Sequence, residues 1–153
     1  MPPARSIVVR RTLPASRERV FAAWCRPELM GQWFFPAPGW RADVEADLRP
    51  EGRYRVAMRD EAGGVHVQEG VYREIEPVSR LVFTWTCSEL GVSNSLVTLE
   101  LHARGAASTE LVLTHELLPP DPAIVREHEE GWDGCLNNLA RFFAQDDDKE
   151  RRT

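Results

Sequence analysis

The chain has little lysine and little cysteine. Lys149 is the only lysine among 153 residues, and it lies in a charged C-terminal stretch. We therefore expect neither a Schiff-base nucleophile nor a phosphate-binding loop with its lysine. The three cysteines, Cys25, Cys87 and Cys135, are odd in number and far apart. This favours reduced, buried thiols that act as small hydrophobes.

Several functional signatures are also missing. The four histidines (His66, His102, His115 and His128) are isolated from one another, and no H-E-x-x-H motif occurs, so we expect no metal site and no cofactor. No G-x-S-x-G or G-x-G-x-x-G motif occurs either. A formal net charge of −5 without a basic block argues against nucleic-acid binding.

The chain also has no apolar run long enough to span a membrane. The segment Met1–Leu13 lacks the apolar core of a signal peptide. Together with the unpaired cysteines, these absences predict a cytoplasmic protein.

What the chain does contain is the hydrophobic patterning of one globular domain. Ser6–Leu13 is rich in β-branched residues and stops at Pro14, which predicts a strand. Ser16 is typical of a helix N-cap, and the apolar residues after it recur at helical spacing. Pro27 favours a second short helix, because proline is tolerated at the first helical position. Residues 34–40, with two prolines and a glycine, predict an aromatic loop.

From residue 41 the pattern changes to an alternation with a period of two, interrupted by turn residues. Tight connections between the alternating segments predict six strands that follow one another as an antiparallel meander. On the second of these strands, an arginine stripe indicates a solvated outer face. The predicted strands are Val44–Leu48, Arg53–Asp60, Val65–Ile75, Arg80–Cys87, Ser95–His102 and Thr109–Leu117.

A long amphipathic helix is predicted from Pro122 to Phe143, capped by Asp121. At about 1.5 Å per residue it would span about 33 Å, so it alone could lie across the sheet. We predict an α+β fold in which a curved antiparallel sheet of about seven strands wraps on this helix, with two short helices after the first strand. Residues 1–145 would form one domain, and 146–153 a charged, frayed tail.

Strand alternation predicts which side chains face the space between sheet and helix. The strand Val65–Ile75 stays ambiguous, because turning its valines inward would turn Glu69 and Arg73 inward as well. The inward residues of the three following strands are predicted to be Leu81, Phe83 and Trp85; Val97, Leu99 and Leu101; and Leu111, Leu113, His115 and Leu117.

Short stretches in a fixed order carry a family resemblance: Val20–Trp24, Pro27-Glu28, Trp33, Asp47–Tyr54, Gly70–Pro77, Leu81–Trp85 and Glu130–Trp132. In this combined order, over roughly Ser6 to Phe143, the chain resembles the activator of heat-shock-protein ATPase homologue branch of the START-like superfamily. The resemblance implies the helix-grip fold with a hydrophobic tunnel. One departure is Glu51, where the family usually has a second glycine, and we expect this position to avoid a positive φ.

The tunnel is the predicted ligand site. The residues alone leave a dry core and a ligand pocket equally open, and the resemblance favours the pocket. Gly131 and Gly134 in the predicted helix indicate either close packing or ligand space, with a local kink as a third alternative. The predicted ligand-binding residues are Trp24, Met30, Trp33, Phe34, Tyr54, Met58, Phe83, Trp85, Val97, Leu99, Leu113, His115, Trp132 and Leu136.

Two polar residues are candidates for catalysis, His115 and Glu69. His115 should point inward, although a buried neutral histidine with one hydrogen bond is the commoner explanation. Glu69 would join it only if its strand presents that face, and Tyr54 could add a hydroxyl to the same wall. Acid–base chemistry would require both groups within hydrogen-bonding reach of one ligand.

Three functions stay open at this point. The first is binding of a small apolar or amphipathic molecule, and the second is a cyclase-, dehydratase- or hydrolase-like enzyme acting on a polyketide-type or aromatic compound. The third is a co-chaperone or protein-interaction module. The better-known activators carry a further domain before this one, whereas the first strand here begins within ten residues, so we expect no chaperone partner. A homodimer through the outer sheet face also stays open.

Overall fold

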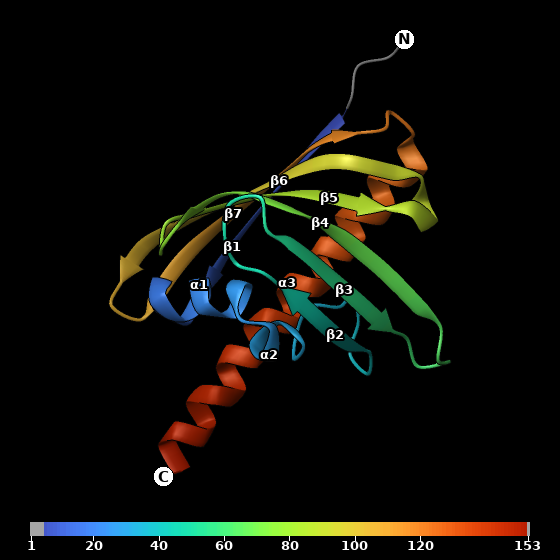
Figure 1. Ribbon diagram of the computed structural model, residues 1–153. Helices are drawn as coiled ribbons and strands as arrows, with labels where there is room; N and C mark the ends of the chain where they lie inside the picture. Colours follow the sequence, from blue (N-terminus) through green and yellow to red (C-terminus); the bar gives the residue numbers. More distant parts are fainter. Residues whose placement is uncertain (1–4, 153) are drawn as a thin grey trace.

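A curved, seven-stranded antiparallel sheet wraps around a long C-terminal helix (Figure 1). The computed structural model describes residues 5–152, with side chains described as far as Gln145. The strand order is β1-β7-β6-β5-β4-β3-β2, so the first strand lies beside the last and the others form the predicted meander. The strands are β1 (Arg5–Leu13), β2 (Arg41–Ala46), β3 (Arg53–Arg59), β4 (Val65–Glu76), β5 (Arg80–Cys87), β6 (Val92–Gly105) and β7 (Ser108–Leu118).

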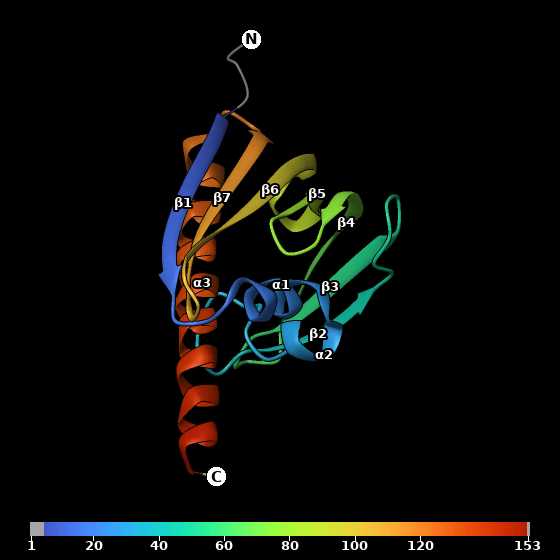
Figure 2. The same cartoon turned by 90° about the vertical axis from the view of Figure 1, so that its left-hand side faces the viewer.

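The C-terminal helix α3 (Pro122–Arg152) lies along the concave side of the sheet, beside β1 and β7 in Figure 2. Its buried face includes Trp132, Leu136, Leu139 and Phe143, as the apolar stripe predicts. The helix continues past Phe143, the end that the stripe predicted, and its last turns project beyond the sheet. Of the predicted charged, frayed tail 146–153, the structure describes only the backbone of residues 146–152, which belongs to α3. Their side chains and Thr153 lie outside the described residues, so the fraying stays a prediction. No helix in the described chain has the length and apolar character needed to cross a membrane.

Two short helices follow β1, as predicted. In α1 (Arg17–Cys25) the Ser16 hydroxyl caps the N-terminus by accepting a hydrogen bond from the backbone N–H of Arg19. In α2 (Pro27–Met30) proline occupies the first turn, where its missing N–H costs no helical hydrogen bond. Helix α1 contacts β6 and β7 and helix α2 contacts β2, so the two short helices pack on the same side of the sheet as α3 (Figure 2). A single 3-10 turn, η1 (Ser88–Leu90), follows β5.

The predicted inward residues of β5 and β6, and those of β7 as far as His115, are all buried. Leu117 is the exception, and its prediction was wrong. It has a φ of 63° and is 58% exposed. A residue in the left-handed region interrupts the alternation, so the neighbouring Leu118 takes the buried place instead.

The ambiguous strand β4 presents its other face to the helix. Gln68 and Tyr72 are buried, whereas Val65, Glu69 and Arg73 are exposed. Glu69 therefore points away from α3, because side chains of opposite parity lie on opposite faces of a strand.

The expectation that Glu51 avoids a positive φ is also wrong, since its φ is 68°. This conformation costs a residue with a side chain about 1 kcal/mol. Two contacts hold it: the Glu51 N–H donates to the carbonyl oxygen of Tyr72 at 2.8 Å, and its carboxylate accepts from Arg73 Nη1 at 2.6 Å. The turn instead requires glycine at Gly52, where a Cβ would lie 2.0 Å from the carbonyl oxygen of Asp47.

Candidate functional site

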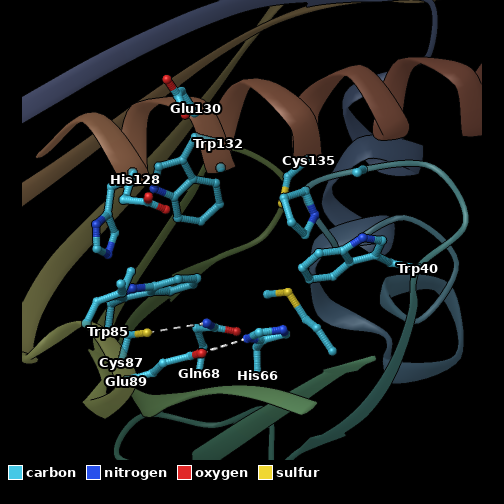
Figure 3. A pocket seen from close by; sticks show the side chains of 16 residues that line it. Trp40, His66, Gln68, Trp85, Cys87, Glu89, His128, Glu130, Trp132 and Cys135 are labelled. Atoms are coloured by element: carbon cyan, nitrogen blue, oxygen red, sulfur yellow. Dashed lines mark hydrogen bonds and ion pairs between the residues drawn. The ribbon is translucent and has the colours of Figure 1, made fainter. Parts of the chain in front are cut away.

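A pocket of about 470 Å³ lies between α3 and the β3–β5 part of the sheet (Figure 3). The loop after α2 bounds it on one side and η1 on another, so four separate parts of the chain meet there. The volume lies in the range of pockets that hold small organic molecules. The lining residues are Pro36, Ala37, Trp40, Met58, His66, Gln68, Trp85, Cys87, Glu89, Leu90, Glu127, His128, Glu130, Gly131, Trp132 and Cys135.

Three indole rings form much of the pocket wall, and each comes from a different element. Trp40 is in the loop before β2, Trp85 is on the inward face of β5, and Trp132 is on the buried stripe of α3. The ring centroids of Trp85 and Trp132 are 5.0 Å apart. Broad indole surfaces on several sides suit a flat, apolar guest.

The surroundings of the two glycines in α3 differ. A Cβ on Gly131 would meet no atom within 4 Å, and this residue lines the pocket beside Trp132. A Cβ on Gly134 would lie 1.8 Å from the carbonyl oxygen of Pro36. Gly134 thus permits close packing of the aromatic loop on α3, whereas Gly131 borders open space in the pocket, and whether a ligand uses that space stays a prediction.

Trp132 is held in place by a buried chain of hydrogen bonds through His115. The Trp132 Nε1–H donates to His115 Nδ1 at 3.0 Å, so the proton of the neutral imidazole is on Nε2. Nε2 donates to Ser95 Oγ at 2.8 Å, and that hydroxyl donates to the carbonyl oxygen of Trp85 at 2.7 Å. Burial and, to a smaller extent, His128 lower the pKa of His115 to about 3. His115 is therefore a neutral positioning residue with both ring nitrogens occupied.

His128 offers the pocket a hydrogen-bond acceptor. Its Nδ1 lies 2.8 Å from the carbonyl oxygen of Ile124, one turn earlier in α3, so Nδ1 carries the proton and donates it. Nε2 is then the unprotonated nitrogen of the ring. Burial lowers the pKa of His128, although the hydrogen bond to Ile124 and the charge of Glu127 act in the opposite direction. The neutral form therefore predominates at neutral pH.

Two buried polar atoms of the lining have no hydrogen-bond partner in the described part of the chain: Gln68 Oε1 and Trp85 Nε1. Gln68 is 7% exposed, and its Nε2 donates to Cys87 Sγ at 3.5 Å. A third such atom, Trp24 Nε1, lies in the aromatic core outside this pocket. An unpaired buried polar atom costs about 1–3 kcal/mol. The pocket therefore presents an acceptor and a donor that a bound molecule could satisfy.

His66 links two elements at the pocket. Its Nε2 lies 2.9 Å from Asp60 Oδ2 and its Nδ1 lies 2.8 Å from Glu89 Oε2. These hydrogen bonds, first to Asp60 and then to Glu89, raise the pKa of His66, and bonding to His66 lowers the pKa of Asp60. The ring stacks on Trp40 with a centroid separation of 5.2 Å. The Asp60–His66–Glu89 triad thus connects the β3–β4 turn, β4 and η1 on one side of the pocket, and Figure 3 shows its contact between His66 and Glu89.

The predicted ligand-binding residues divide between the pocket and a packed core. Met58, Trp85 and Trp132 line the pocket. Trp24, Met30, Phe34, Tyr54 and Phe83 surround a gap of about 10 Å³, the size of a single water. The others are buried outside the pocket lining: Trp33, Val97, Leu99, Leu113, His115 and Leu136.

The packed core is an interlocked aromatic cluster around Trp24. Its ring centroid lies 4.8 Å from that of Trp33, 5.8 Å from that of Phe34 and 6.1 Å from that of Trp132. The space near α1 and α2 is therefore filled. A packed core and an open pocket therefore occupy different parts of the same concave side, and the pocket as a ligand site stays a prediction.

The structure does not bring the two candidate catalytic residues together. Glu69 is exposed on the outer face of β4, opposite Arg55 of β3 and Thr86 of β5, whereas His115 is fully buried on the inner side. The Tyr54 hydroxyl is also engaged, because it donates to the carbonyl oxygen of Thr84 at 2.5 Å. No acid–base pair forms from these groups.

Sequence reasoning missed most polar residues of the pocket. His66 and Gln68 lie on the face of the strand opposite Glu69, and because the inward face of Val65–Ile75 was left open, neither residue was predicted. Trp40 and Glu89 lie in a loop and a 3-10 turn, where no periodicity exists to predict direction.

Two cysteines line the pocket. Cys87 and Cys135 are buried and free, and burial raises the pKa of the Cys135 thiol to about 12. A thiol that stays protonated at neutral pH is a poor nucleophile and metal ligand. In the described residues, no group of three or more His, Cys, Asp or Glu side chains is arranged to hold a metal ion.

Comparison with known proteins identifies relatives of the whole domain. The family described as Activator of Hsp90 ATPase homolog 1-like protein matches residues 14–144. No curated protein matches the chain. A solved structure from Rhizobium leguminosarum is similar at 29% identity and a TM-score of 0.75, covering 93% of this chain and 95% of that one.

Two further solved structures share the fold. A protein from Chromobacterium violaceum is 27% identical with a TM-score of 0.77, covering 90% of this chain and 96% of that one. A protein described as an HSP90 activator from Plasmodium falciparum is 20% identical with a TM-score of 0.73, covering 91% of this chain and 96% of that one. At that identity the second likeness concerns the fold alone. The fold they share is typical of ligand-binding or interaction modules.

Proposed function

The chain belongs to the Activator of Hsp90 ATPase homolog 1-like family, with its helix-grip fold, and from this premise we propose that it binds a small, largely apolar molecule in the pocket between α3 and β3–β5. The binding is non-covalent, and the protein acts as a binding module in the cytoplasm. The observation that carries the proposal is the pairing of open space with unsatisfied polarity: the pocket contains Gln68 Oε1 and Trp85 Nε1, both buried and unpartnered within the described chain.

The helix sequence supports this proposal. A glycine within a helix costs about 1 kcal/mol relative to alanine. At Gly131 no packing contact explains that cost, since a Cβ would meet nothing within 4 Å. Space for a guest beside Trp132 is a sufficient reason for a glycine at this position.

The supporting hydrogen bonds favour a preformed site. The His115–Ser95 chain fixes the Trp132 ring, and the Asp60–His66–Glu89 triad fixes the ring on which Trp40 stacks. Rigid walls lose little conformational entropy when a ligand binds, which strengthens binding.

The enzyme alternative has less support. Its two candidate groups, Glu69 and His115, lie on opposite faces of the sheet, and the pocket histidines either bridge carboxylates or serve as neutral hydrogen-bonding groups. Chaperone binding also has less support, since the likeness to the Plasmodium activator concerns the fold alone and no surface feature among the described residues points to such a partner.

A neutral fluorescent probe tests the proposal. Titration with N-phenylnaphthylamine should give a saturable, single-site rise in fluorescence with the wild-type protein. Gly131→Leu places an isobutyl group in the open space and should abolish that rise while the far-ultraviolet circular dichroism stays unchanged.

The control is Glu129→Leu, which puts the same leucine side chain at an exposed position of α3 outside the pocket lining. This variant should bind the probe as the wild type does. Equal binding by Gly131→Leu and the wild type would place the probe elsewhere and refute the proposal.

A further inference from the structure

The charged groups around the pocket are predominantly acidic. Its lining includes the carboxylates of Glu89, Glu127 and Glu130, and none of the 16 lining residues is lysine or arginine. Glu127 and Glu130 have no ion-pair partner among the described residues. The Glu130 carboxylate projects away from Trp85 in Figure 3, so its charge acts on the pocket at longer range than that of Glu127, which affects His128.

Protonation of His66, the lining residue whose pKa is raised, does not make the surroundings of the pocket positive. Both of its nitrogens contact carboxylates, of Asp60 and Glu89, so the triad carries one net negative charge when His66 is protonated. A ligand carboxylate would thus meet repulsion from the triad and from Glu127, and no lysine or arginine side chain lines the pocket to compensate it.

The hydrogen-bonding atoms inside the pocket give a second, independent indication of the ligand's chemistry. Gln68 is more than nine-tenths buried, and its Oε1 has no donor among the described residues. Figure 3 shows the amide nitrogen turned towards Cys87 and the oxygen turned the other way, towards His66. His128 Nε2 is another acceptor, because Nδ1 holds the proton. The buried Gln68 Oε1 therefore requires a hydrogen-bond donor from the ligand, and His128 Nε2 can accept a second one.

The indole walls also suit a cation. The faces of tryptophan rings attract positive charge more strongly than those of other aromatic side chains. The stacking of His66 on Trp40 at 5.2 Å already places a basic ring against one of these faces. Trp85 and Trp132 present two further indoles to the same space. The unpartnered Trp85 Nε1–H, in contrast, requires an acceptor atom on the ligand.

We propose that this pocket selects an organic cation: a protonated amine on an aromatic or alicyclic body that also carries one hydrogen-bond acceptor such as an ether or carbonyl oxygen. This inference rests on the proposed binding function and names its ligand class. The ammonium donates to Gln68 Oε1 within the field of Glu89 and Glu127, the body lies among the three indoles, and the acceptor receives the Trp85 N–H. Carboxylate and sulfonate analogues are rejected.

Three probes of one shape and different charge test the ligand class: naphthylethylamine, naphthylethanol and naphthylpropionate. Calorimetric titration at low salt should give roughly tenfold or greater preference for the amine over the carboxylate, with the alcohol between them. Added salt should reduce this preference, because ions screen exposed carboxylates. NMR shifts of the indole N–H signals of Trp40, Trp85 and Trp132 would report whether each probe occupies the pocket.

The double variant Glu127→Gln/Glu130→Gln should reduce the preference for the amine over the alcohol about three- to fivefold, since each exposed carboxylate contributes modestly. Glu129→Gln, on the same helix but outside the pocket lining, should leave the ratio unchanged. Equal affinity for the three probes, with shifts at the pocket indoles, would overturn the charge preference and leave the binding function standing. Failure of all three probes to shift those indoles would overturn both.

Discussion

Alanine at Gly131 and at Gly134 should change stability in opposite directions, although the two positions are three residues apart in one helix. At Gly131 the new methyl group meets nothing within 4 Å. The change then acts mainly through backbone entropy and helix propensity, which favour alanine by about 0.5–1 kcal/mol. For a chain of this size we expect a rise in Tm of about 2–4 °C.

At Gly134 the same methyl group would lie 1.8 Å from the carbonyl oxygen of Pro36 and 2.7 Å from the carbonyl carbon. Backbone has to move, and overpacking of this kind costs about 1–3 kcal/mol or more. The displaced loop is also tied to α3 by Asn138 Nδ2, which donates to the carbonyl oxygen of Phe35 at 2.7 Å. Weakening that buried bond adds about 1 kcal/mol, so the net loss at Gly134 is about 2 kcal/mol after the gain in helix propensity.

Urea unfolding followed by tryptophan fluorescence, with scanning calorimetry alongside, measures both variants against the wild type. The expected separation between them is about 3 kcal/mol in the free energy of unfolding at an unchanged m-value. Equal stabilisation by both alanines would show that the aromatic loop does not press on α3 at Gly134. A large loss at Gly131→Ala would show that its surroundings are packed, and the pocket would then lose its best structural support.

Two further predictions concern the polar groups of the site. The pKa of His115 is lowered to about 3, so between pH 6.5 and 3 the folded protein binds fewer protons at this residue than the unfolded chain does. The stability that His115 contributes is therefore fully present above about pH 6.5 and is lost as the pH falls towards 3. Its imidazole NMR signals should therefore remain those of the neutral Nε2–H tautomer down to about pH 5, and titration near pH 6.5 in the folded state would contradict the buried network. Gln68→Leu removes an unpartnered buried oxygen, so it should raise the free energy of unfolding by about 1 kcal/mol in urea titrations while it weakens naphthylethylamine binding. A loss of stability would mean that this oxygen has a partner in the free protein.

Local chemistry made much of the fold predictable from the sequence. The start of α1 follows from the Ser16 hydroxyl and the start of α2 from Pro27. The buried face of α3 follows from an apolar stripe that reaches Phe143, and each of these features depends on residues close together in the sequence. Alternation likewise placed the core residues of β5 and β6, because successive side chains point to opposite faces of a strand. It failed at Leu117, where one left-handed residue shifts the pattern.

Other features depended on contacts between distant parts of the chain. The sequence showed an excess of aromatic residues facing the helix, but it could not tell which rings would interlock. Trp24 packs against Trp33 and Phe34 and fills one end, whereas Trp85 and Trp132 face open space with Trp40. Ring packing is set by three-dimensional geometry, to which several elements contribute at once.

The sequence by itself determined the order of the elements, the helix that the sheet wraps around and the mostly apolar character of the surface between them. Tertiary structure alone decided where that surface stays open, which face of β4 supplies Gln68 and His66, and why Gly131 and Gly134 differ. The physical reason is range: propensity and periodicity act over a few residues, whereas a cavity exists only where chain segments far apart in sequence fail to fill the space between them.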